Sequence, residues 1–166
     1  MSAKSTPTVT GHQRIGPKAK SEYDRDMRRT EPAIILDTNV FVSALFNPES
    51  DSARICDAVR SGRLRMIWND ATQRETRSVL EMIPPLSWRA VEGLFRDENR
   101  FARATDASRF QQISDPEDRK FAALAHATGS ILISQDADLL AHPYRFDVLV
   151  LTPSEFATGE WASVEL

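Results

Sequence analysis

Short, mostly apolar runs recur along this chain and alternate with stretches of helical periodicity. The first run is "AIIL" at residues 33–36, and others follow at 64–68, 131–134 and 146–151. Runs of this length and composition are typical of strands buried on both faces of a sheet. The intervening sequence predicts helices at 38–46, 52–61, 70–83, 87 to about 103, 115–128 and 153–159. This alternation predicts an α/β fold with a central, mainly parallel sheet between two helical layers, a three-layer α/β/α arrangement.

Length and composition fit one packed domain. The chain has 166 residues, of which 41% are hydrophobic and 27% charged, as in ordinary globular proteins. The start of the chain lacks apolar periodicity, so we expect a flexible tail at 1–30, a domain at 31–160 and a short tail at 161–166. Cys56 is the single cysteine, and neither a signal-peptide pattern nor an apolar run of about 20 residues occurs. We therefore expect a cytoplasmic protein that does not associate with a membrane.

Two aspartates follow predicted strands directly. Asp37 ends "AIIL", and Asp136 lies just past "ILIS". Because the carboxyl ends of parallel strands meet at one edge of a sheet, we expect both carboxylates to project from that edge, where ligands gather. Each also has an ordinary structural interpretation, since Asp37 can cap the following helix and Asp136 can serve a turn.

A glutamate interrupts the apolar face of the third predicted helix. Glu75 falls between Ala71 and Val79, with Met82 continuing the pattern at helical spacing. Burying a charged carboxylate away from water costs on the order of several kcal/mol unless a cation or hydrogen bonds compensate. Either a metal ion or a salt bridge to one of the many arginines would explain Glu75.

The segment "DPEDRKFAAL" contributes a fourth acid, Asp118. Asp115 is a good helix N-cap, Pro116 suits the first helical position, and a capping box would account for both aspartates without any function. Asp118 also lines up with Ala122 and Ala125, on the small-residue face that we expect to lie near the core.

These four acids together indicate a cation site better than any one of them does. Converging carboxylates repel one another unless they are protonated or neutralised. Oxygen-only ligands suit Mg²⁺ or Mn²⁺. Zinc fits poorly, since the single cysteine and three histidines show no ligand spacing.

At this point the sequence resembles the PIN-domain family of metal-dependent nucleases, in particular the VapC-like toxin ribonucleases of bacterial toxin–antitoxin systems. The resemblance rests on "IILDTNVFVSAL", "TQRETRSVL", "DPEDRKFAALAHATGSILIS" and "SQDADLL", in the family's order, with "FDVLVLTPSEF" as a fitting end. The tail at residues 1–30 is longer than in the small toxins, and the segment between Glu75 and Asp118 cannot be matched residue by residue.

The resemblance implies a role for each acid. Asp37, Glu75, Asp118 and Asp136 match the family's catalytic, metal-binding positions for one or two Mg²⁺ or Mn²⁺ ions. Supporting polar positions are Asn39 and Ser134, the latter in place of a common threonine, with Asp115 and Asp138 nearby. The implied reaction is hydrolysis of RNA phosphodiester bonds.

Binding of RNA to an acidic site requires cations around it. Candidates are Arg74, Arg77, Arg119 and Lys120, which neighbour the acids in sequence and are equally well explained as solvated helix charges. The resemblance further implies an antitoxin partner and a homodimer.

Two other classes of protein remain as alternatives. A non-catalytic module could keep the fold and use the acids to bind protein or RNA. Another phosphoryl-transfer α/β protein, such as a phosphatase or a receiver domain, could use Asp37 and Asp136 but would leave Glu75 unexplained.

Overall fold

A parallel sheet forms the centre of the protein. The structure, a computed structural model, describes residues 32–141 and 147–159. Four strands lie in the order β2-β1-β3-β4, all neighbours being parallel. Their bounds are β1 Ala33–Leu36, β2 Arg65–Met66, β3 Ile131–Ile133 and β4 Val150–Leu151. The predicted mainly parallel sheet is therefore confirmed.

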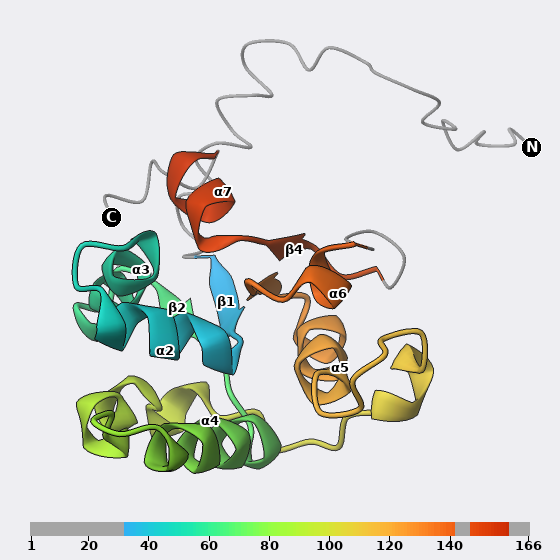
Figure 1. The fold of residues 1–166 in the computed structure, drawn as a ribbon. Helices are drawn as coiled ribbons and strands as arrows, with labels where there is room; N and C mark the ends of the chain where they lie inside the picture. Colours follow the sequence, from blue (N-terminus) through green and yellow to red (C-terminus); the bar gives the residue numbers. More distant parts are fainter. Residues whose placement is uncertain (1–31, 142–146, 160–166) are drawn as a thin grey trace, which may run out of the picture. The chain divides into compact units, whose positions relative to one another are not determined.

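Helices connect the strands and cover the sheet (Figure 1). They are α2 Thr38–Phe46, α3 Asp51–Arg60, α4 Asp70–Met82, α5 Arg119–Thr128, α6 Ala137–Leu140 and α7 Pro153–Thr158. Local sequence explains several of their ends. Ser50 caps α3 by accepting a hydrogen bond from the Ala53 N–H, and Asn69 forms a capping box with Thr72 at the start of α4. Gly129 ends α5 with a φ of 63°, a conformation that glycine adopts without strain.

Alternation along β1 divides the apolar interior into two layers. Ile34 and Leu36 face one cluster, to which Phe41 of α2 and Ile55 of α3 also belong. Ile35, between them, belongs to the opposite cluster with the α5 side chains Phe121, Ala122 and Leu124. Figure 1 shows α2 and α3 on one side of β1 and α5 on the other. Successive strand residues point to opposite faces, so the three-layer prediction is confirmed.

The predicted helix from Ser87 to about Arg103 is wrong. Three short 3₁₀ helices occupy this segment: η1 Trp88–Ala90, η2 Glu92–Leu94 and η3 Asp97–Asn99. Ser87 does cap the first of them, accepting from the Arg89 N–H. Val91, Leu94 and Phe95 are buried at spacings of three and one, and the 3₁₀ turns between them break the 3.6-residue period that a continuous helix requires. A further 3₁₀ turn, η4 Ala107–Phe110, was not expected from the sequence.

Two predicted strands are shorter than the apolar runs suggest. In the 64–68 run, pairing with β1 covers Arg65 and Met66, while Trp68 forms an isolated parallel bridge with Arg100. In the 146–151 run, pairing with β3 covers Val150 and Leu151. The positive φ of Asp147, 52°, interrupts the extended backbone there.

The predicted tails, residues 1–30 and 161–166, lie outside the described residues. Cys56 is buried in α3 beside Ile55 and Val59, and burial raises the pKa of its thiol to about 12. Among residues 32–141 and 147–159, no helix has the length and apolar character needed to cross a membrane.

Candidate active site

Asp37 is a buried carboxylate at the carboxyl end of β1. Its side chain is 3% exposed and makes no capping hydrogen bond to α2, so capping does not explain it. Instead, its Oδ2 accepts a 2.7 Å hydrogen bond from the Ser134 hydroxyl, which follows β3. Burial raises the pKa of Asp37, the bonds from Ser134 and Thr38 lower it, and the charges of Asp136 and Glu75 raise it again.

Asp136 lies at the same edge, after the neighbouring strand. Its Oδ1 accepts from the N–H groups of Asp138, at 2.8 Å, and Leu139, at 3.4 Å. Its own N–H donates to the Ser134 hydroxyl at 2.9 Å. Asp136 is thus the N-cap of α6 rather than the turn residue that the sequence suggested, and this capping role coexists with its interaction with Asp37. Ser134 links the two, since one hydroxyl donates to Asp37 and accepts from Asp136.

Asp118 does not take part in the expected capping box. The α-helix begins one residue later, and the Asp118 side chain makes no capping bond. Asp115 instead caps a preceding turn, in which its Oδ1 accepts from the Glu117 N–H and its carbonyl accepts from the Asp118 N–H. Because this turn closes with an i→i+3 hydrogen bond, the α-helix begins only at Arg119, after Asp118. The carboxylate of Asp118 is thereby left out of helix capping.

The electrostatics of Asp118 show which acids surround it. Burial raises its pKa from 3.8 to about 7, with further increases from the negative charges of Asp37, Asp136, Asp115 and Asp138, in that order. Burial makes the largest contribution, and the four charge contributions arise only because these carboxylates lie near Asp118. Acids from the ends of β1 and β3 and the start of α5 therefore converge.

The apolar stripe predicted for α4 is wrong. The helix buries Thr72, Thr76 and Leu80, whereas Met82 is 72% exposed and Ala71 is also exposed. The cause is polar packing, because the Thr76 hydroxyl shares a 3.2 Å buried hydrogen bond with the Thr38 hydroxyl of α2. Threonines give little hydrophobic signal in sequence, so this face was missed.

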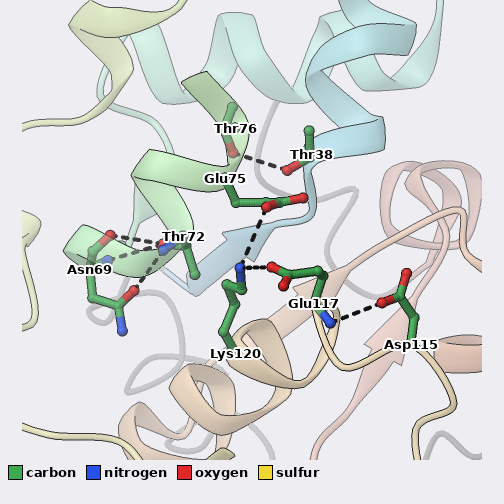
Figure 2. Close-up of polar contacts among 8 residues, drawn as sticks. All are labelled: Thr38, Asn69, Thr72, Glu75, Thr76, Asp115, Glu117 and Lys120. Atoms are coloured by element: carbon green, nitrogen blue, oxygen red, sulfur yellow. Dashed lines mark hydrogen bonds and ion pairs between the residues drawn. The ribbon is translucent and has the colours of Figure 1, made fainter. Parts of the chain in front are cut away.

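Glu75 lies at the edge of that buried face and is paired with a cation. Figure 2 shows Lys120 of α5 between Glu75 and Glu117. Lys120 Nζ is 3.4 Å from Glu75 Oε2 and also contacts the Glu117 carboxylate. The salt-bridge alternative for Glu75 is thus realised, with a lysine rather than an arginine as partner. The Lys120 side chain is 22% exposed and that of Glu75 26%.

The four supporting polar candidates differ in their contacts. Ser134 is fully buried and Asn39 is exposed on the first turn of α2. Asp138 accepts from the Ser114 N–H at 2.6 Å, which ties the loop before α5 to α6. Asp115, as described, organises the turn before Asp118.

The four basic candidates also divide. Arg77 forms an exposed ion pair with Glu81, one turn along α4. Arg119 donates to the carbonyls of Ile113 and Gln111, and so holds a loop. Arg74 is exposed, and Lys120 lies among the acids. The structure thus brings Lys120 into the acidic site and gives Arg77 and Arg119 other partners.

The donor set fits a hard divalent cation by its chemistry. It consists of carboxylate oxygens at the sheet edge where ligands bind in parallel α/β folds, and the negative charges of neighbouring acids help to raise the pKa of Asp37 and of Asp118. Within the described residues, no three or more His, Cys, Asp or Glu side chains stand close enough together to hold a metal ion. The Glu75–Lys120 ion pair would have to open before Glu75 could act as a ligand.

Comparison with known proteins identifies this architecture. A family model described as "PIN domain" matches residues 33–138, a span that holds the strand-end acids, Glu75 and Asp118. The chain belongs to the PIN-domain family. A similar solved structure, "Structure of FitAB bound to IR36 DNA fragment", is 19% identical to this PIN-domain protein, with a TM-score of 0.48 over 72% of this chain and 94% of that one. No curated protein matches the sequence.

Proposed function

We propose that this PIN-domain protein is a Mg²⁺- or Mn²⁺-dependent endoribonuclease whose metal ligands are Asp37, Glu75, Asp118 and Asp136. The observation that carries the proposal is that Asp37 and Asp136, at the ends of β1 and β3, both hydrogen-bond to Ser134. Their negative charges also act on Asp118 at the start of α5. PIN domains are generally nucleases, and the donor chemistry suits these ions.

The protein's own groups would prepare the site in three ways. The Ser134 hydroxyl orients Asp37 and supports the Asp136 loop. The Thr38–Thr76 hydrogen bond joins α2 to α4 and so supports Glu75 from its own helix. When bound, the ion would make a water molecule a better nucleophile and offset charge developing on the phosphate.

The substrate and partners follow from the same proposal. RNA would approach an acidic centre whose nearby cations are Lys120 and the exposed Arg74, with Arg77 and Arg119 contributing less because they have other partners. We propose that the protein is the toxin of a toxin–antitoxin pair, acts as a homodimer in the cytoplasm and is inhibited by an antitoxin protein, as in the toxins that its motifs resemble.

RNA cleavage by Asp37→Asn tests the nuclease proposal. With Mn²⁺ and a fluorogenic RNA, this variant should lose activity by about a hundredfold or more, since it removes a proposed ligand. The control is Glu81→Gln, which removes an exposed carboxylate from the same helix as Glu75 and should retain activity. Equal cleavage by wild type and Asp37→Asn, each free of contaminating nuclease, would refute the proposal.

A non-catalytic binding module is the second candidate. The Glu75–Lys120 ion pair favours it, because a neutralised Glu75 needs no metal. Calorimetric titration with Mn²⁺ distinguishes the two functions, since a pure binding module should show no saturable metal binding at millimolar concentrations.

A further inference from the structure

We infer that Lys120 is a built-in cation that neutralises Glu75 in the metal-free protein and competes with the metal ion for it. The inference rests on the proposed metal-dependent function and concerns how loading of that site is controlled. In this role Lys120 acts on Glu75 and on metal binding, and not through contact with RNA.

The geometry places Lys120 where competition must occur. Its ammonium group is 3.4 Å from Glu75 Oε2, and it reaches this point from α5, on the other side of the site from α4 (Figure 2). Both side chains are largely buried, so the interaction is screened less than a surface ion pair. A metal ion coordinated by Glu75 would repel the Lys120 ammonium at this separation.

The charge balance explains why a cation is needed there. Asp37, Asp118 and Asp136 already repel one another, and Glu75 adds to the unfavourable charge on Asp37. Among residues 32–141 and 147–159, Lys120 is the one cationic side chain in ion-pair contact with any of these four acids. It therefore stabilises the acidic site while no metal is present.

Glu117 offers the displaced ammonium an alternative partner. It contacts Lys120 on the same segment, three residues earlier, and its side chain is 62% exposed. Lys120 can keep this partner when it releases Glu75, so the separation costs less than exposing an unpaired charge. Lys120 thus has two acceptors, one inside the site and one at its rim.

The test measures Mn²⁺ affinity by calorimetry for Lys120→Gln. Removing the competing charge should tighten Mn²⁺ binding about fivefold, the scale expected for a partly screened ion pair. The matched control is Arg60→Gln, which removes one positive charge from an i,i+3 ion pair with Asp57 on α3 and should change the affinity less than about twofold.

Glu117→Gln supplies a second, independent variant. Loss of this partner leaves Lys120 bound to Glu75 alone and should weaken Mn²⁺ binding by about twofold to fivefold. In the Lys120→Gln background, Glu117→Gln should weaken Mn²⁺ binding less, because no lysine is then present for Glu117 to draw away from Glu75. A double-mutant cycle over the two positions measures this coupling directly.

Thermal unfolding gives a readout that does not depend on activity. In chelator, Lys120→Gln should have a lower Tm than wild type, and saturating Mn²⁺ should raise the Tm more for the variant than for wild type. Mn²⁺ binding by wild type with no gain in Lys120→Gln over Arg60→Gln would overturn the role of Lys120 and leave the nuclease proposal standing. Absence of Mn²⁺ binding by wild type would overturn both.

Discussion

The Ser134 hydroxyl donates a 2.7 Å hydrogen bond to the Asp37 carboxylate, joining residues 97 positions apart in the chain at adjacent strand ends. Both side chains are buried, so the bond fixes a charged group where water is scarce. The same hydroxyl accepts from the Asp136 N–H. A small polar residue after β3 therefore connects two proposed ligands.

Ser134→Ala should impair both folding and metal binding. The variant leaves a buried carboxylate without its side-chain donor, which should lower the free energy of unfolding by about 1–3 kcal/mol and weaken Mn²⁺ binding about tenfold to a hundredfold. Urea unfolding and calorimetry measure the two effects. Ser134→Thr keeps the hydroxyl and should restore both.

Ser130→Ala is the matched control for Ser134. Ser130 is also buried, just before β3, and its hydroxyl bonds to that of Thr128 rather than to an acid. The Ser130→Ala variant should have a lower free energy of unfolding and an unchanged affinity for Mn²⁺. Equal affinities for the two alanine variants would contradict the orienting role of Ser134.

The raised pKa of Asp118 predicts a pH dependence of stability. Folding raises this pKa from 3.8 to about 7, so between these values the folded protein holds a proton that the unfolded chain has released. The contribution of Asp118 is therefore fully present below about pH 4 and is lost as the pH rises through about 7. In chelator, the Tm of wild type relative to that of Asp118→Asn should fall as the pH rises from about 5 to about 8. A constant Tm difference over that range would contradict the shift.

Two substitutions on α4 decide which face of the helix is buried. Leu80 is fully buried and Met82 is 72% exposed. Leu80→Ala should therefore lower the free energy of unfolding by about 2–5 kcal/mol, and Met82→Ala should change it by less than about 0.5 kcal/mol. Chemical denaturation of both variants tests this. A larger loss of unfolding free energy for Met82→Ala than for Leu80→Ala would instead support the apolar stripe expected from the sequence.

Much of the first half of the fold could be predicted from sequence because local signals there agree. "AIIL" is strand β1 and the helix after it spans Thr38–Phe46 as expected. The segment after Pro85 was misjudged because its buried residues serve 3₁₀ turns, whose spacing resembles that of an α-helix over one turn.

The site was predicted as a set of acids, and its contacts were not. Asp37 and Asp136 could be placed because parallel strand ends share an edge. The Glu75–Lys120 pair could not, since it joins two helices 45 residues apart and no local spacing reports it. The nearest sequence signal was the i,i+3 relation of Glu117 and Lys120.

Anomalous diffraction from crystals soaked in Mn²⁺ tests the central claim most directly. The proposed function predicts a peak about 2.1 Å from carboxylate oxygens of the set formed by Asp37, Glu75, Asp118 and Asp136, with Lys120 Nζ moved away from Glu75 toward Glu117. A fully soaked crystal without a peak among these four acids would contradict the account.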